Sequence, residues 1–232
     1  MDLDNFDITE GTTGTCTDSF GVTVGSSRIY KDLCGTLSGQ HIYLETARKT
    51  SDQTLTFTIA TTSTSATWRV KVSQIECWNT NKAPNDCYQY FTGIAGDVQS
   101  LNYPTVMIQY TKYMICVRQE LGYCGIQWSP AANTSPDPFQ VGDDTADAFA
   151  DGDADGEDAF IEILGSMNVF YSGEHLGDDS TVIAANRDEV SGSVLAVGMP
   201  FTLLATAVIA DSTSLGFDLV WRQVPCGGFR QT

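Results

Sequence analysis

The stretches "FDLVWRQVPC" (217–226) and "WRVKVSQIEC" (68–77) decide the fold that we expect for this chain. Large apolar residues alternate with other residues at the start of both stretches, as they do on a strand with one buried face. Each stretch then continues through a glutamine to a cysteine. We interpret the two stretches as equivalent strands of a repeated unit.

Short runs of the same kind recur along the rest of the chain, and no helical period persists. Examples are residues 55–59, 114–117 and 125–128, which are separated by clusters of Gly, Asn, Asp, Ser and Thr. This spacing predicts an all-β protein with an antiparallel sandwich or barrel. We expect the tryptophans within strands to be core or half-buried residues, and Trp78 to lie at the surface; the strand tryptophans are Trp68, Trp128 and Trp221.

Two further pairs of stretches repeat in the same order. "DSFGVTVG" (18–25) matches "DAFIEILG" (158–165), and "FDI" (6–8) matches "FQV" (139–141). The first copy has no counterpart of residues 87–130. We therefore expect a partial β domain that forms the back part of a sandwich (1–78), a polar linker (79–86), one complete domain (87–226) and a tail (227–232).

The composition limits the class of partner and the compartment. The 232 residues carry a net charge of -17, with 12 basic residues scattered among 29 acidic ones. Nucleic acid and acidic membranes require clustered Lys and Arg, so cations or basic proteins are better partners. Seven cysteines without a C-x-x-C pair, beside only two histidines, indicate disulfides and a secreted, extracellular protein. Asn133 begins a glycosylation sequon, which agrees with secretion.

Two segments bear on targeting. The first eight residues have neither the basic nor the apolar segment of a signal peptide, so we expect a trimmed chain or a fragment. The uncharged run Val190–Ala210 is long enough to suggest a membrane span. Gly198, Met199 and Pro200 interrupt it, and the flanking pieces are rich in Val, Ile and Thr. We interpret this run as two buried strands joined by a turn.

Several features follow one another in residues 87–226. Cys87 precedes "GIAGDVQSLNYP" (93–104), then come Tyr113 and Cys116, and "ADSTSLGFDLVW" (210–221) closes the series. In this order they resemble the CUB domain family, and other fragments are similar to secreted multi-CUB proteins of arthropods. The resemblance implies a jelly-roll β-sandwich, in agreement with the strand pattern.

The resemblance also implies disulfides. A first CUB pair would join Cys87 to Cys116, and the usual second pair maps onto Cys16 and Cys34 of the first copy. One bond and one odd thiol then remain for Cys77, Cys124 and Cys226. We favour Cys77 with Cys124, because Cys77 directly precedes the domain in which Cys116 and Cys124 flank a hairpin, but the sequence leaves this connectivity open.

The acidic segment "DGDADGEDAFIE" (151–162) fits the pattern D-x-[DN]-x-[DN]-G-x5-E of calcium loops. The residues that follow, 160–164, are typical of a strand, so the loop lacks the helix that usually comes next. Eight of the sixteen residues from 143 to 158 are acidic, and without a cation each pair at 4 Å would repel by about 1 kcal/mol in water. The candidate calcium ligands in this segment are Asp151, Asp153, Asp155, Glu157, Asp158 and Glu162.

The resemblance adds Asp211, because many CUB domains bind calcium at one end of the sandwich through three acidic residues. Ala159 stands where the second of them belongs, and the first has no clear counterpart. The acidic segment lies between the strand expected at 139–141 and the strand expected at 160–164, which is where the CUB domain has this loop. We therefore expect the acidic segment at the same end as Asp211. The alternative interpretation is a flexible, solvated loop whose repulsion is screened by salt.

No catalytic pattern supports an enzyme. The sequence lacks G-x-S-x-G, Walker, G-x-G-x-x-G and H-E-x-x-H motifs, and His41 and His175 stand alone. We predict a non-enzymatic secreted interaction module that binds an extracellular protein or glycan, with calcium as its candidate cofactor. Two alternatives remain: a subunit that assembles with copies of itself into a matrix or filament through exposed sheet edges, and an accessory domain fragment of a secreted protease.

Overall fold

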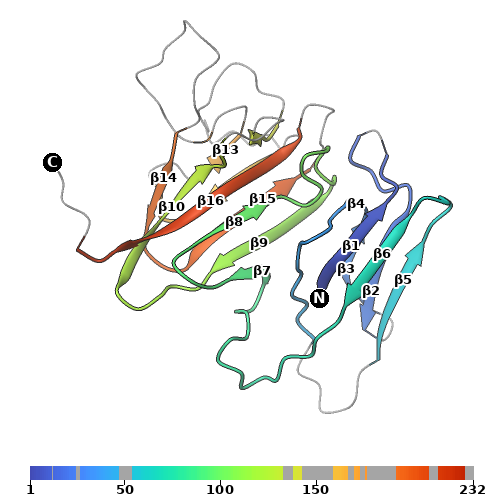
Figure 1. Cartoon of the computed structure of the whole chain (residues 1–232), viewed down its shortest axis with the longest axis horizontal. Coiled ribbons are helices and arrows are strands. Elements are labelled where there is room, and N and C mark those ends of the chain that lie inside the picture. Colours follow the sequence, from blue (N-terminus) through green and yellow to red (C-terminus); the bar gives the residue numbers. More distant parts are fainter. Residues whose placement is uncertain are drawn as a thin grey trace, which may run out of the picture.

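The structure is a computed structural model that describes residues 1–11, 13–24, 27–46, 54–132, 138–142, 159–166, 170–172, 176, 192–208 and 214–227. Every regular element in these residues is a β-strand, which confirms the all-β prediction (Figure 1). The described residues contain no helix that is long and apolar enough to cross a membrane. The uncharged run at 190–210 contains two strands on either side of Gly198–Pro200, as expected.

Residues 1–78, called here the N-terminal unit, form two small sheets. One sheet has the order β4-β1-β6 and the other the order β3-β2-β5. Phe6 of the first sheet meets Phe20 of the second edge-on, with ring centroids 5.5 Å apart, so the two sheets pack face to face. The strands are β1 (Asp2–Ile8), β2 (Ser19–Val24), β3 (Ser27–Leu33), β4 (Gly35–Thr36), β5 (Leu55–Ala60) and β6 (Thr67–Lys71).

Residues 87–226, the C-terminal unit, form two five-stranded sheets. In the first sheet β11-β16-β10-β14 follow one another, and β8 lies along β16 on the same side as β11. The first-sheet strands are β8 (Ala95–Gln99), β10 (Tyr123–Pro130), β11 (Phe139–Gln140), β14 (Val194–Val197) and β16 (Gly216–Pro225). The second sheet has the order β13-β12-β15-β9-β7. Its strands are β7 (Cys87–Phe91), β9 (Thr111–Val117), β12 (Ala159–Ile163), β13 (Phe170–Tyr171) and β15 (Phe201–Ala207).

The core of the C-terminal unit lies between these sheets. Trp128 of β10 lies opposite Trp221 of β16, and both side chains are buried. Gly96 of β8 makes room for this arrangement, since a Cβ atom there would lie 2.8 Å from the Trp221 ring. Trp128 and Trp221 therefore lie in the core as expected, and Trp78, which is 79% exposed, lies at the surface as expected. Trp68 is 46% exposed.

Strand pairing is the same at equivalent places in the two units. Phe6 pairs with Trp68 in the N-terminal unit, and Phe139 pairs with Phe217 in the C-terminal unit. These are the residues that the sequence repeat aligns. Both units thus use the same pair of strands, β1 with β6 and β11 with β16.

The structure contains the disulfides Cys16–Cys34 and Cys87–Cys116, as the resemblance implied. The pairing of Cys77 with Cys124 was wrong: Cys124 bonds to Cys226, with Cα atoms 4.7 Å apart, and Cys77 is an exposed free thiol. The prediction assumed that Cys116 and Cys124 flank a hairpin, and this assumption was wrong. β9 and β10 belong to different sheets, and β10 runs beside β16, where Tyr123 pairs with Pro225.

The two units touch along one side (Figure 1). The Tyr43 amide donates to the Tyr88 carbonyl oxygen at 2.7 Å, so the segment after β4 lies along β7. The imidazole Nε2 of His41 lies 3.2 Å from the Tyr90 amide nitrogen and 3.1 Å from the Tyr90 carbonyl oxygen. Most of the buried apolar residues of both units form one continuous cluster, and Ala83, Cys87, Tyr90 and Cys116 form a smaller second one.

Candidate functional site

The two segments that carry the expected calcium ligands have their flanks at one end of the C-terminal unit. The acidic segment, taken from here on as residues 143–158, follows Gly142, after β11, and ends where β12 begins at Ala159. The closing segment follows Val208, after β15, and ends at Ser214, before β16. Because Ala159 pairs with Ala207 and Gln140 pairs with Gly216, the flanks lie beside one another across the strand ladders.

Most of the expected ligands lie outside the described residues; these are Asp151, Asp153, Asp155, Glu157, Asp158 and Asp211. The sequon residue Asn133 also lies outside them. Within the described part of the chain, no group of three or more His, Cys, Asp or Glu residues is arranged to hold a metal ion.

Glu162 is the one expected ligand that the structure describes, and it lies in a strand. It is the fourth residue of β12, between the buried Ile161 and Ile163, and it pairs with Leu204 and Phe170. It lies three positions along the strand from Ala159, a distance of about 10 Å. Glu162 therefore lies back from the end of the sandwich, on the face opposite the core. It is a poor calcium ligand, because a strand cannot wrap its residues around an ion as a loop does.

Ala159 is the residue that stands where the CUB resemblance expects an aspartate. It is fully buried and begins β12. Its methyl group offers no oxygen ligand. Any ion at this end would therefore have to be held by the loops.

The loop between β8 and β9, residues 100–110 and called here the base loop, lies beneath this end. The Met107 amide donates to the Ser214 carbonyl oxygen at 2.9 Å, and the Tyr110 amide donates to the Val208 carbonyl oxygen at 3.2 Å. The Phe217 amide donates to the Ser100 hydroxyl at 3.0 Å. These bonds hold both flanks of the closing segment against a buried loop, which leaves the segment anchored at its two ends.

Gly216 is required at this base. Its φ angle is 92°, a conformation that L-residues with a side chain rarely adopt. A Cβ atom there would also collide with the Ser100 hydroxyl. The glycine of the closing motif therefore allows the start of β16 to lie directly against the base loop.

The corresponding end of the N-terminal unit is organised around one buried carboxylate. Asp18 accepts hydrogen bonds from the Thr61 hydroxyl at 2.7 Å and from the Thr62 amide at 2.9 Å. The Thr61 hydroxyl, followed by the Thr62 amide, lowers the pKa of Asp18 from 3.8 to about 2. These hydrogen bonds stabilise the ionised form of Asp18.

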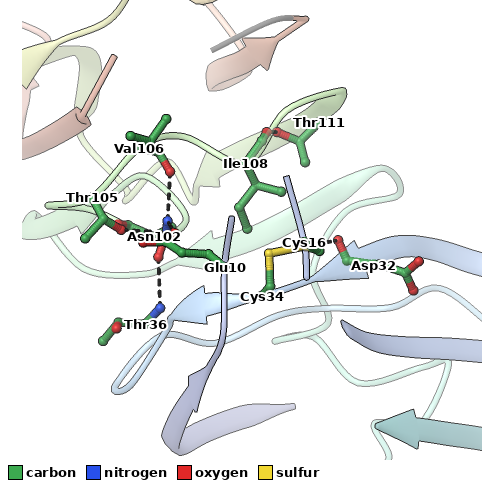
Figure 2. The surroundings of a disulfide bond; sticks show 10 residues. All are labelled: Glu10, Cys16, Asp32, Cys34, Thr36, Asn102, Thr105, Val106, Ile108 and Thr111. Carbon is green, nitrogen blue, oxygen red and sulfur yellow. Dashed lines mark hydrogen bonds between the residues drawn. A yellow bond between two sulfur atoms is a disulfide. The ribbon is translucent and has the colours of Figure 1, made fainter. Parts of the chain in front are cut away.

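Asn102 joins the two units, and the sequence did not single it out (Figure 2). Its side-chain amide donates to the Val106 carbonyl oxygen at 2.7 Å and also to Glu10, while its Oδ1 accepts from the Thr36 amide at 2.8 Å. It is fully buried with a φ of 72°, a left-handed conformation that asparagine tolerates better than most residues. Asn102 belongs to the Asn-Tyr-Pro motif, but the motif alone does not predict which residues its side chain contacts.

The environment of Glu10 follows from this contact. Burial raises the pKa of Glu10, and the hydrogen bonds from Asn102 and Thr105 lower it by less. Gly35, with a φ of 81°, lies so close to Asn102 that a Cβ atom would collide with its side chain. The base loop is therefore packed between the two units, beside the Cys16–Cys34 disulfide (Figure 2).

Comparison with known proteins agrees with this architecture. A family model for the animal CUB domain matches residues 84–224. Among solved structures, the chain is similar to the CUB1-EGF-CUB2 domain of human MASP-1/3, at 12% identity and a TM-score of 0.35, covering 95% of this chain and 85% of that one. It is also similar to the CUB1-EGF-CUB2 domains of rat MASP-1, at 11% identity and a TM-score of 0.32, covering 94% and 83%. No curated protein matches the sequence.

Proposed function

Because this chain belongs to the animal CUB domain family, whose members are generally extracellular protein-interaction modules, we propose that it binds a partner through one end of its C-terminal sandwich. The partner is an extracellular protein or glycan that presents a basic group. Calcium held by the acidic segment orders the loops for this contact. CUB domains are non-catalytic, so the proposed activity is binding alone.

One observation carries the proposal. The flanks of the acidic segment and of the closing segment are paired at the same end of the sandwich, through Ala159 with Ala207 and Gln140 with Gly216. Two loops that start from neighbouring strands can bring their side chains to one ion. The proposed ligands are Asp151, Asp153, Asp155, Glu157, Asp158 and Asp211; Glu162 is left out because it lies within β12.

The charge supports a cation or a basic partner. Half of the residues from 143 to 158 are acidic, and oxygen ligands are those that calcium prefers. A divalent ion would relieve their mutual repulsion, and the carboxylate oxygens left over would attract a lysine side chain. An extracellular compartment, where CUB domains mainly occur, supplies calcium at a concentration suited to a modest site.

Thermal unfolding with and without calcium tests the metal part of the proposal. Added calcium should raise the melting temperature of the wild type by several degrees, and a chelator should reverse the shift; at a hundredfold excess over Kd, binding contributes about 2.7 kcal/mol. Asp153→Asn and Asp211→Asn should each remove most of the effect. Glu76→Gln, an exposed acidic position in the N-terminal unit, is the matched control and should keep it.

Calorimetry with a lysine-rich peptide tests the binding part. The wild type should bind this probe more tightly with calcium than with chelator, and the variant that combines Asp153→Asn with Asp211→Asn should lose the difference. Equal binding by wild type and variant would contradict the site. If calcium and chelator leave the melting temperature unchanged, calcium is not the cofactor.

A further inference from the structure

Two strands of the N-terminal unit have a free edge within the part of the chain that the structure describes. Among the described residues, β5 pairs only with β2, and β6 pairs only with β1. Their equivalents in the C-terminal unit have partners on both sides: β15 lies between β12 and β9, and β16 lies between β11 and β10. Free strand edges present unpaired amide and carbonyl groups, which can accept another strand.

The core face of the N-terminal unit is open along these edges. Trp68 lies opposite the buried Phe6 and so shares its inward face, yet it is 46% exposed. Phe57 of β5 stacks on the buried Phe20, with ring centroids 6.3 Å apart, and is still 38% exposed. Val72, just after β6, is 49% exposed.

In the C-terminal unit the same face is covered. Phe217, which pairs with Phe139 as Trp68 pairs with Phe6, is fully buried, and Trp221 is 1% exposed. The inward residues of β15 are buried as well. β9 and β10 lie directly beside these strands, where Ile115 is opposite Leu203 and Trp128 is opposite Trp221.

A groove of about 940 Å³ runs beside the open face of the N-terminal unit. Leu55, Phe57, Val72 and Ile75 line one wall, and Met114 and Leu204 of the C-terminal unit line the other. The groove is also lined by charged side chains, including Glu76, Lys82 and Asp86. The C-terminal unit stands across the groove, so the space admits strands more readily than it admits a whole folded domain.

From the free edges, the exposed inner face and the covered equivalent in the same chain, we propose that the N-terminal unit is an acceptor site for a two-stranded segment of the kind formed by residues 111–130. One strand adds antiparallel to β5 and the other antiparallel to β6, as β9 adds to β15 and β10 adds to β16. The occupant carries large apolar residues at alternate positions, matching Tyr113, Ile115 and Val117 in its first strand and Ile126 and Trp128 in its second. Its loop crosses from one sheet to the other.

Charge favours this occupant over a second copy of the chain. Residues 1–78 contain nine acidic and six basic residues, whereas residues 111–130 contain Lys112, Arg118 and Glu120, a net charge of +1. A second complete copy would bring a further charge of -17 to the same place. Its own β9 and β10 are already held between other strands, so it has no free segment of this kind to donate.

Hydrogen–deuterium exchange on the full chain tests the proposal. The probe is a synthetic peptide of residues 111–130 with Cys116→Ser and Cys124→Ser. At saturation, amides in residues 54–60 and 67–72 should exchange about tenfold more slowly or better, since strand addition hydrogen-bonds the free edges. Amides of β15 and β16 should not change. A peptide that also carries Ile115→Asp and Trp128→Asp should give no protection.

Variants of the chain sharpen the result. Phe57→Lys should abolish protection by the probe, because it places a charge on the open inner face. Leu121→Lys is the matched control, since Leu121 is a fully exposed apolar residue in the C-terminal unit. It should leave protection unchanged.

Three outcomes would overturn the proposal. The first is unchanged exchange at β5 and β6 with saturating probe. The second is protection confined to β15 and β16, which would mean that the peptide had displaced strands of the C-terminal unit. The third is protection that rises with the concentration of the chain alone, together with a dimer mass in light scattering; a second copy would then be the occupant. None of these results depends on calcium, so they are separate from the test of the proposed function.

A fusion gives an independent measurement. A duplicate of residues 87–130 joined ahead of Met1 should protect β5 and β6 without added peptide and shift Trp68 fluorescence to shorter wavelength. The same fusion with Ile115→Asp and Trp128→Asp in the duplicate alone should do neither. An intact fusion that leaves both readouts unchanged would also contradict the acceptor site.

Discussion

At the scale of single residues, Asp18 shows how the N-terminal unit holds a buried acidic side chain. Asp18 is buried beneath Thr61 and Thr62, and its charge is satisfied by hydroxyl and amide hydrogens. The sequence repeat aligns Asp18 with Asp158, which ends a segment of the C-terminal unit that is rich in carboxylates. A carboxylate that protein donors already satisfy has less affinity left for a cation.

The Asp18 environment predicts a defined pH dependence. Its folded-state pKa of about 2 is below the ordinary 3.8, so its stabilising contribution is present above about pH 4 and is lost as the pH falls towards 2. Asp18→Asn should melt several degrees below the wild type at pH 6, and the difference should shrink between pH 4 and pH 2. Asp4→Asn, at an exposed carboxylate, should stay close to the wild type throughout. A difference that is constant with pH would refute the assignment.

The cysteines predict a second residue-scale result. Cys77→Ser should change the free energy of unfolding by less than about 0.5 kcal/mol, since the side chain is exposed and unbonded. The double variant Cys124→Ser with Cys226→Ser should lose about 2–5 kcal/mol, because this bond closes a long loop. Urea unfolding measures both. Alkylation of the native chain should label Cys77 only, and labelling at Cys124 would contradict the pairing.

At the scale of elements, the base loop between β8 and β9 does two jobs. It supports the closing segment through Met107 and Tyr110, and it connects the two units through Asn102. Gly14 also lies against it, since the Gln109 amide donates to the Gly14 carbonyl oxygen at 2.9 Å. A change in this loop should therefore be felt in both units.

Asn102 is the residue with which to test this role of the loop. Asn102→Gly keeps the tolerance for a positive φ but removes the side-chain amide, which should lower the free energy of unfolding by roughly 1–3 kcal/mol. Asn85→Ala, at an exposed position of the linker, should change it by less than about 0.5 kcal/mol. Urea titration provides the comparison. If Asn102→Gly is as stable as Asn85→Ala, the contact with Thr36 and Val106 is not important for stability.

At the scale of the whole molecule, the units differ in how complete their sandwiches are. The sheets of the C-terminal unit bury large side chains from both sides, including Trp128, Trp221 and Phe217. The N-terminal unit leaves Phe57, Trp68 and Val72 partly exposed and rests against the base loop and β7. Its stability should therefore depend on the C-terminal unit, while the reverse dependence should be weak.

Separate expression tests this dependence. Residues 79–232 alone should unfold in one cooperative transition with a melting temperature close to that of the full chain. Residues 1–78 alone should show no cooperative transition, because their core face is open on one side and their remaining support is removed. Circular dichroism in the near ultraviolet during heating measures both fragments. A cooperative transition in residues 1–78 would show that this unit needs no neighbour.

The sequence alone was sufficient for the features that depend on neighbours along the chain. The alternation of apolar residues predicted the strands, and the repeat of residues 68–77 in 217–226 predicted that β6 and β16 are equivalent, because side-chain direction in a strand is set by local geometry. Resemblance to a family supplied the pairs Cys16–Cys34 and Cys87–Cys116.

Only the tertiary structure decided the features that depend on which strands lie side by side. Cys124 bonds to Cys226 because β10 runs along β16 and not back along β9, a choice that no local pattern contains. Trp68 has the same alternating surroundings in sequence as its counterpart Phe217, yet Trp68 is half exposed and Phe217 is buried. β16 has strands along both of its edges, whereas among the described residues β6 has a strand along one edge only.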